Sequence, residues 1–363
     1  MRQHRDANPD TVTLPRRAML RAAVAAGLGT FGAGIGRVFA SPGLHLPAEI
    51  ASTPICHVAE TVLARPNTKL TLSWSANAIC TVGILVAQQR GIFERHNLDV
   101  ELVSFAGSTD QLLEAISSGK ADAGVGMALR WLKPLEQGFD VKITTGVHSG
   151  CMRLLATPGS EIRGVADLKG RTVGVSDMAA PDKNFFSIVA AKQGIDPASD
   201  VAWKAFPADL LSLALKKGEI DAVSLIDPLA TVIRDRDGLT EIANNISGDY
   251  AQRVCCVLGI GGKLVRNDRA AAGALTQSLR EAGEYVATNP DDAATLFAPY
   301  SPAPVAQLAQ MLRSHNHHHH PVGTDLRAEL AAYTDDLKLV QVIRAGLDSQ
   351  RFADKIYADV LTS

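Results

Sequence analysis

Short apolar runs alternate with stretches of helical periodicity along most of the chain. Leu70, Leu72 and Trp74 alternate with polar residues, which predicts a strand. A helix over residues 82–90 follows, and Val100 begins the next apolar run. Strands that alternate with helices form parallel sheets covered by helices, so the pattern predicts an α/β fold.

Residues 100–126 contain the clearest unit of this kind. A β-prone run ends at Gly107, a helix with one apolar face follows, and a short strand of small residues comes next. Ser108 or Thr109 can cap this helix, and its free amide groups face the carboxyl ends of the strands. Such a helix end is suited to an anion or a polar group, and an ordinary capped helix is the alternative.

The same order of elements recurs further along the chain, with a strand at 172–175, a helix at 182–193 and a strand at 221–225. Two such regions predict two lobes, each with a mainly parallel sheet flanked by helices, joined by two hinge crossings. We place lobe 1 at residues 69–150 and 257–363, and lobe 2 with both hinge segments at 151–256.

The first 40 residues have the order of an export signal. A basic segment with the pair Arg16-Arg17 precedes an Ala/Gly-rich apolar stretch, and Val38-Phe39-Ala40 offers a small-residue cleavage site. The arginine pair indicates the twin-arginine route and a periplasmic protein, with a disordered basic tail as the alternative. Residues 41–68, which contain scattered prolines, are predicted to be a linker.

Composition excludes some classes of partner. The 363 residues are 46% hydrophobic and 20% charged, as in ordinary globular proteins. No apolar run reaches the roughly 18 residues of a membrane span. The leader is rich in arginine, so the mature chain is more acidic than the net charge of −2 of the whole sequence. An acidic chain argues against a nucleic-acid partner.

Four motifs occur in order within residues 69–297. GIFERHNLDVEL enters the second strand, DLKGRTVGV and GEIDAV contain two strands of lobe 2, and NPD lies in a later helical segment. This order resembles the solute-binding proteins of nitrate-, sulfonate- and taurine-type ABC importers, a family that includes relatives concerned with thiamine-pyrimidine compounds. The resemblance implies the bilobed fold, a small-molecule ligand and the membrane permease of an ABC importer as partner.

The resemblance also implies which loops line a cleft between the lobes. The ligand-binding residues expected from it are Trp74, Asn77, Ser108, Thr109, Met127, His148, Ser149, Ser176, Asp177, Asn184 and Asp227. The ligand is expected to be small and polar or anionic, either nitrate-, sulfonate- or taurine-like or pyrimidine-like, and hinge closure holds it. We expect a monomer without a cofactor.

The cysteines depart from the general pattern of that family. His148 and Cys151 follow the last strand before the first crossing, and Cys255-Cys256 lies where the chain returns. Because the two crossing segments should run side by side, we expect Cys255 or Cys256 near Cys151, with Cα atoms within about 7 Å. A buried apolar hinge, a disulfide and a metal- or thiol-dependent site, with binding or enzymatic activity, remain open alternatives.

Five histidines occur within residues 315–320. The candidate ligands of a transition metal are His148, Cys151, His317, His318, His319 and His320. We expect a solvated loop with incidental metal affinity, and a metal site is the alternative.

Catalytic signatures are absent from the sequence. It contains no G-x-S-x-G elbow, no H-E-x-x-H helix and no P-loop, so we expect a protein without enzymatic activity. A pyrimidine-synthase-like activity is a weaker alternative, because Cys255-Cys256 resembles the cysteine-rich stretch of the eukaryotic relatives only faintly.

Overall fold

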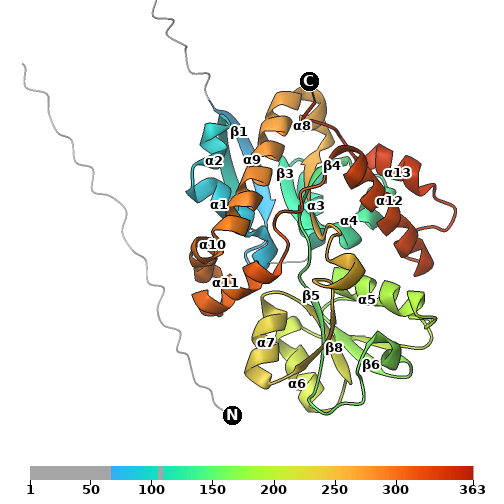
Figure 1. Cartoon of the computed structure of the whole chain (residues 1–363). Coiled ribbons are helices and arrows are strands. Elements are labelled where there is room, and N and C mark those ends of the chain that lie inside the picture. Colours follow the sequence, from blue (N-terminus) through green and yellow to red (C-terminus); the bar gives the residue numbers. More distant parts are fainter. Residues whose placement is uncertain (1–66, 105–108, 363) are drawn as a thin grey trace, which may run out of the picture. The chain divides into compact units, whose positions relative to one another are not determined.

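The computed structural model describes residues 67–104 and 109–362, and the side chains of Thr109 and Asp110 are not described. Helices surround two five-stranded sheets in this part of the chain (Figure 1). The predicted leader, nearly all of the predicted linker and Ser108 lie outside the described residues. No helix within the described ranges is long and apolar enough to cross a membrane.

Sheet 1 has the strand order β2-β1-β3-β10-β4. Its strands are β1 (Thr68–Trp74), β2 (Leu98–Ser104), β3 (Ala123–Met127), β4 (Val141–His148) and β10 (Cys256–Gly261). β1 pairs in parallel with β2 and β3, whereas β10 pairs antiparallel with both β3 and β4. β10 is therefore the one reversed strand of this sheet.

Sheet 2 repeats this plan with the order β7-β6-β8-β5-β9. Its strands are β5 (Met152–Ala156), β6 (Thr172–Val175), β7 (Ala202–Ala205), β8 (Ala222–Ile226) and β9 (Thr240–Asn244). Here β5 is the reversed strand, because it runs antiparallel to β8 and β9. The prediction of mainly parallel sheets holds for the other strands. It missed β5 and β10, which are the first strands that the chain forms after each crossing.

Helices cover the faces of both sheets (Figure 1). Their bounds are α1 (Val82–Gln89), α2 (Ile92–Arg95), α3 (Thr109–Ser117), α4 (Ala128–Glu136), α5 (Pro181–Lys192), α6 (Leu211–Lys216), α7 (Leu229–Asp237), α8 (Gly262–Asn267), α9 (Arg269–Thr288), α10 (Pro290–Phe297), α11 (Val305–Ser314), α12 (Gly323–Leu339) and α13 (Ser349–Ile356). The short 3-10 helices are η1 (Ile79–Thr81), η2 (Val165–Leu168), η3 (Ala208–Leu210), η4 (Gly248–Tyr250) and η5 (Ala298–Tyr300).

The small residues of β3 and β10 make room for Trp131 of α4, which is fully buried. A Cβ atom on Gly126 would lie 2.1 Å from the Trp131 ring, and one on Gly259 would lie 2.7 Å from it. Only glycine permits this close approach, so the indole packs directly on the backbone of the two strands. This packing fixes α4, which carries Arg130, against the edge of the pocket described below.

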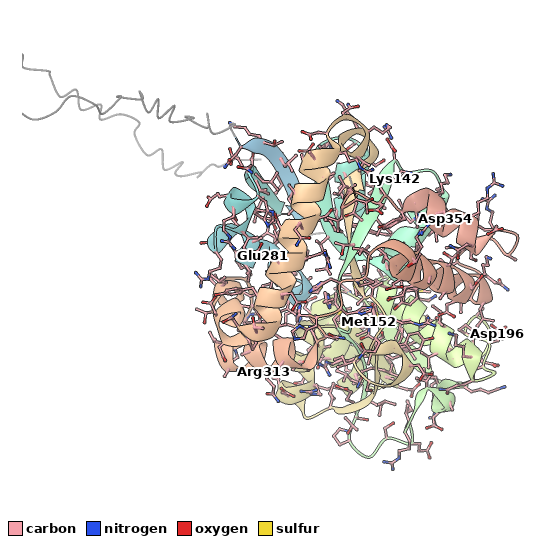
Figure 2. All side chains as sticks on the ribbon, turned by 45° about the horizontal axis from the view of Figure 1, so that its top comes forward. Lys142, Met152, Asp196, Glu281, Arg313 and Asp354 are labelled. Atoms are coloured by element: carbon pink, nitrogen blue, oxygen red, sulfur yellow. The ribbon has the colours of Figure 1, made fainter. Side chains whose placement is uncertain are left out.

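Three segments meet between the sheets. The chain crosses from β4 to β5 at residues 149–151 and returns from β9 to β10 at residues 245–255, and Met152 marks the start of β5 in Figure 2. The third segment is residues 315–320, which we call the histidine run. Asn316 and Ser149 exchange backbone hydrogen bonds of 3.0 and 3.1 Å. Just after the run, the Pro321 carbonyl accepts a hydrogen bond from the Gly146 amide at 3.0 Å. The sequence predicted the two crossings and missed this third segment.

Candidate functional site

A cavity of about 190 Å³ lies between the two sheets. Its wall comes from the carboxyl ends of β1, β3, β6 and β8, from the starts of α5 and β10, and from side chains of α3 and α4. Loops at the carboxyl ends of parallel strands are the usual place for a ligand in α/β proteins. The lining residues are Ser75, Asn77, Ala78, Cys80, Thr81, Leu112, Val125, Gly126, Met127, Arg130, Ser176, Asp177, Ala180, Pro181, Asp182, Ile226 and Cys256.

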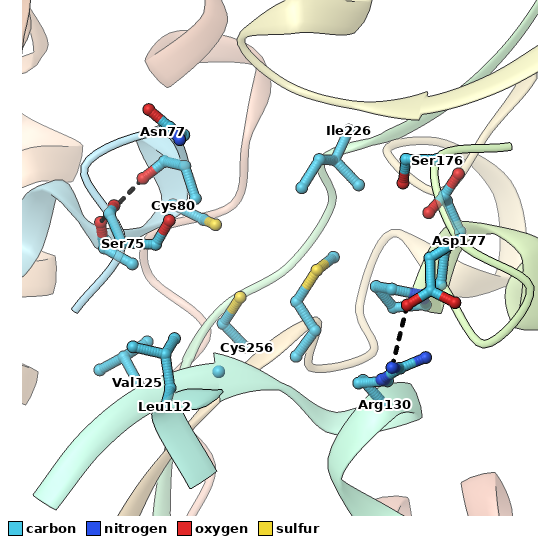
Figure 3. A pocket seen from close by; sticks show the side chains of 17 residues that line it. Ser75, Asn77, Cys80, Leu112, Val125, Arg130, Ser176, Asp177, Ile226 and Cys256 are labelled. Carbon is cyan, nitrogen blue, oxygen red and sulfur yellow. Dashed lines mark hydrogen bonds and ion pairs between the residues drawn. The ribbon is translucent and has the colours of Figure 1, made fainter. Parts of the chain in front are cut away.

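Arg130 and Asp177 bridge this pocket from opposite sides. Arg130 Nη2 of α4 donates to Asp177 Oδ2 in the loop after β6, at 3.0 Å (Figure 3). Nearby, Asn184 Nδ2 of α5 donates to the Leu129 carbonyl at 3.2 Å. Both bonds join a residue of the sheet 1 side to one of the sheet 2 side, so they connect the two sides of the pocket.

Asp182 occupies the first turn of α5 at the pocket wall and is 3% exposed. Burial raises the pKa of this carboxyl group. The Ser224 hydroxyl donates to Asp182 Oδ2 at 2.6 Å. Because an acidic side chain already sits at this helix end, the first turn of α5 is poorly suited to bind a second anion.

The predicted ligand-binding residues divide into three groups. Four of them line the pocket, namely Asn77, Met127, Ser176 and Asp177. Five described ones do not, namely Trp74, His148, Ser149, Asn184 and Asp227. Ser108 and the Thr109 side chain lie outside the described part of the chain.

The five residues away from the pocket wall have other contacts. Trp74 packs edge-on against Tyr300 of η5, with ring centroids 5.1 Å apart. Asn184 points from α5 towards α4, as its bond to Leu129 requires. Ser149 lies in the first crossing beside Asn316. His148 and Asp227 belong to two buried polar clusters, described next.

The first cluster, which we call the Asp227 cluster, consists of Asp227, Arg153, Thr231, His315 and Glu241. The Asp227 carboxylate is fully buried and accepts hydrogen bonds from Arg153 Nε and Nη2 at 2.9–3.0 Å and from the Thr231 hydroxyl at 2.7 Å. His315 Nε2 lies 3.0 Å from Asp227 Oδ2. Burial acts to raise the pKa of Asp227, but His315 and Arg153 together hold it well below its usual range.

The second cluster, which we call the thiol cluster, consists of Cys80, Cys151, Cys255 and Cys256 with His148. All five side chains are buried, and all four cysteines are free thiols. Cys151 Sγ lies 3.3 Å from Cys255 Sγ, which confirms the predicted approach of one vicinal cysteine to Cys151. Cys256 instead faces the pocket with Cys80 (Figure 3).

The thiols perturb one another and His148. Hydrogen bonds from Cys151 and Cys256 lower the pKa of Cys80 well below that of a free thiol. Burial acts to lower the pKa of His148, but the neighbouring Cys80, together with Cys255 and the Ser149 backbone, outweighs burial and the pKa is raised. Sequence reasoning missed Cys80. It follows β1 at the carboxyl end of the sheet, the same placement that singled out Trp74 and Asn77.

The histidine run is mostly buried, so the expectation of a solvated loop is wrong. His315, His317 and His320 are 5%, 3% and 9% exposed, whereas the side chain of His318 is largely exposed and reaches Glu284. A backbone bridge pairs Asn316 with Ser149 of the first crossing, and the two side chains that flank Asn316, His315 and His317, are buried. The rings of His148, His315 and His317 lie with their centroids 5.3–5.9 Å apart.

Comparison with known proteins agrees with this architecture. The model of the family described as "NMT1/THI5 like" matches residues 80–293, which is more than half of the chain. The chain belongs to the NMT1/THI5-like family. A putative binding protein of Brucella abortus is similar to this chain, with 24% identity over 225 residues that span 61% of this chain and 68% of that protein.

Two further proteins are similar. A putative thiamine biosynthesis protein of Haemophilus influenzae is 25% identical over 263 residues, which span 68% of this chain and 78% of that protein. The periplasmic aliphatic sulphonate binding protein SsuA of Escherichia coli has a similar structure, with a TM-score of 0.68 and 17% identity over 81% of this chain and 94% of its own. This NMT1/THI5-like chain thus has the bilobed fold of periplasmic binding proteins.

Proposed function

We propose that this chain is a periplasmic solute-binding protein that holds a small polar molecule in the pocket between its two sheets and passes it to the permease of an ABC importer. The observation that carries the proposal is the pocket itself, which is lined from both sheets and bridged by the Arg130–Asp177 pair. The family membership and the names of the binding-protein relatives support it. Export by the twin-arginine route and a monomeric state are parts of the same proposal.

The charges at the pocket favour a ligand that offers both hydrogen-bond donors and acceptors. Arg130 is the only basic residue among the lining residues, which also include two acidic residues, Asp177 and Asp182. A simple anion such as nitrate would meet one guanidinium group and two acidic groups. A zwitterionic aminosulfonate or an amino-pyrimidine can instead donate to a carboxyl group and accept from Arg130.

Closure follows from the position of the ligand. A molecule that binds residues of both sheets stabilises the arrangement in which the two sides are close, by its difference in affinity for the closed and open forms. The Arg130–Asp177 and Asn184–Leu129 bonds already favour that arrangement. A ligand that enters between Arg130 and Asp177 would replace one cross-pocket bond by two.

Calorimetry with three probes tests the proposal: taurine, 4-amino-5-hydroxymethyl-2-methylpyrimidine and nitrate. We expect saturable binding of taurine or of the pyrimidine, and no binding of nitrate in the same concentration range. Arg130→Ala removes a charged donor, which contributes about 1.5–3 kcal/mol, so affinity should fall roughly 10- to 150-fold.

Arg266→Ala is the matched control, because Arg266 pairs with Asp140 at 2.8 Å in an exposed ion pair and does not line the pocket. This variant should bind like the wild type. Binding of nitrate alone would contradict the ligand class. Unchanged affinity in Arg130→Ala, or no binding of any probe, would contradict the assignment of the pocket.

A further inference from the structure

Three potential metal-ligand side chains from distant parts of the sequence converge at the inner end of the pocket. Cys80 comes from η1 after β1, His148 ends β4, and Cys256 begins β10. His148 and Cys256 are direct partners in the β4–β10 pairing, which places their side chains next to each other on one face of sheet 1. One ligand atom from each of the three side chains lies within 4.8 Å of the other two.

His148 lacks the partners that a buried histidine normally has. Its side chain is 0% exposed, and neither Nδ1 nor Nε2 has a hydrogen-bond partner among the described residues. In the neighbouring His317 ring, Nε2 also has no hydrogen-bond partner among the described residues. Buried polar atoms are nearly always hydrogen-bonded, and each one that is not costs about 1–3 kcal/mol. A coordinated ion would give the His148 ring the missing partner.

The donor set selects the kind of ion. Two thiolates and one imidazole are soft to borderline ligands, which Zn(II) and Cu(I) prefer and which Ca(II) and Mg(II) avoid. A Zn–S bond is about 2.3 Å and a Zn–N bond about 2.0–2.1 Å. Ligand atoms around one such ion lie roughly 3.5–4 Å apart, so donor atoms within 4.8 Å of one another need only a small inward shift.

We propose that Cys80, His148 and Cys256 bind one soft closed-shell metal ion, Zn(II) or Cu(I), in the wall of the pocket. Because Cys80 and Cys256 line the pocket, the bound ion would form part of its surface (Figure 3). Three protein ligands satisfy a trigonal Cu(I) ion, whereas Zn(II) takes a fourth ligand and would have one coordination position left. The proposal is independent of the identity of the solute.

The neighbouring thiols supply a sharp control. Cys151 and Cys255 are as buried as Cys80 and Cys256, and their sulfur atoms contact each other at 3.3 Å. Neither is a member of the three-residue group. Replacing Cys151 or Cys255 by Ser therefore changes the number of thiols and the packing of the junction to a similar extent, but leaves the three proposed ligands in place.

The experiment titrates the reduced full-length chain with Zn(II) and, separately, with Cu(I) under anaerobic conditions, against a chromophoric chelator. Co(II) serves as a spectroscopic probe, because thiolate-to-Co(II) charge transfer absorbs in the near ultraviolet. All proteins carry His318→Asn and His319→Asn, since these two exposed or partly exposed imidazoles could bind metal at the surface. Circular dichroism and the ion-free Tm show that each variant is folded.

We expect one ion per chain, a thiolate band with Co(II), and a rise in Tm on binding. Cys80→Ser, Cys256→Ser and His148→Gln should each weaken binding at least about 10- to 100-fold, whereas Cys151→Ser and Cys255→Ser should bind within about threefold of the parent. If Cys80→Ser does not fold, Cys256→Ser and Cys80→Ala provide the same comparison. No thiolate band, or equal losses in Cys151→Ser and Cys256→Ser, would overturn the proposal. Saturation by Zn(II) alone or by Cu(I) alone identifies the ion.

Discussion

The Asp227 cluster and the thiol cluster are neighbours at the junction of the two sheets, yet their central residues, Asp227 and His148, differ in how well their polar atoms are satisfied. The Asp227 amide even donates to the Cys151 carbonyl, at 2.9 Å. Asp227 receives hydrogen bonds from both Arg153 and Thr231 and contacts His315. In the thiol cluster, His148 is equally buried but has no hydrogen-bond partner at either nitrogen within the described residues.

This difference in hydrogen bonding indicates that Asp227 and His148 have different roles. A buried charge surrounded by complementary groups is explained by the fold, because it holds β5, β8 and the histidine run together. A buried imidazole whose nitrogens have no hydrogen-bond partner costs free energy in the folded protein. The ion proposed above would supply the His148 ring with a partner. The comparison can be tested by removing one group from each cluster.

The largest effect is expected for Asp227→Asn. Arg153 is 6% exposed, and this change leaves its guanidinium group without its main counter-charge. Breaking a buried ion pair by removing one partner costs roughly 3–5 kcal/mol. Urea unfolding at pH 7 measures the free energy of unfolding of the variant and of the wild type.

Asp182→Asn is the control for this measurement. Asp182 is also a buried aspartate of the sheet 2 side, but burial raises its pKa and it has no basic partner among the described residues. Its replacement by the neutral amide should cost less than about 1.5 kcal/mol. Equal losses in the two variants would mean that the ion pair does not distinguish the Asp227 cluster.

The sequence carried enough information for the fold and for part of this junction. The alternation of strands and helices was sufficient to predict the fold class, because local periodicity indicates each element. Gly119 and Gly194 follow the ends of their helices with positive φ. The approach of Cys255 to Cys151 followed from topology, since two adjacent crossings must run side by side. The family motifs strengthened both inferences. Neither inference required knowledge of any side-chain packing.

The histidine run was misjudged because composition says nothing about long-range pairing. Six polar residues in a row suggest a solvated loop, but the segment forms a bridge to Ser149, 167 positions earlier in the chain. That pairing brings His317 and His320 inward. Cys80 was missed for a related reason, because its neighbours His148 and Cys256 come from other strands. Contacts between such distant residues leave no local pattern.

A smaller effect, which depends on pH, is expected for His320. Burial lowers its pKa to about 4, although Glu284, 3.6 Å away, opposes this, while Arg280 and His148 act in the same direction as burial. The unfolded chain binds a proton near pH 6.5 and the folded chain only near pH 4. Stability contributed by this group is therefore full above about pH 6.5 and is lost as the pH falls towards 4.

Unfolding measured at pH 7 and at pH 4.5 should show a loss of about 2–3 kcal/mol from this group. Other groups titrate in both proteins. The contribution of His320 is therefore the change in unfolding free energy between pH 7 and pH 4.5 in the wild type minus the same change in His320→Leu. Gly283 provides a second check: a Cβ there would lie 2.1 Å from the His320 ring, so Gly283→Ala should displace the ring and reduce the pH dependence. A pH dependence identical in wild type and His320→Leu would show that the imidazole is solvated.

The smallest effect on stability, and the sharpest test of the comparison, is expected for His148→Leu. In the ion-free, reduced protein, this change replaces a buried ring without hydrogen-bond partners by an apolar side chain of similar volume but different shape. The relief of an unmade hydrogen bond offsets the loss of packing, so the free energy of unfolding should change by less than about 1.5 kcal/mol. The increase in Tm that Zn(II) or Cu(I) gives the wild type should disappear.

Urea unfolding with a chelator present measures the free energy of unfolding, and thermal unfolding with one equivalent of ion measures the increase in Tm. A loss as large as that of Asp227→Asn in the ion-free protein would mean that His148 is bonded there as fully as Asp227. The contrast between the two clusters would then be wrong. A small loss together with a lost response to the ion is the result expected of a side chain whose partner is a metal.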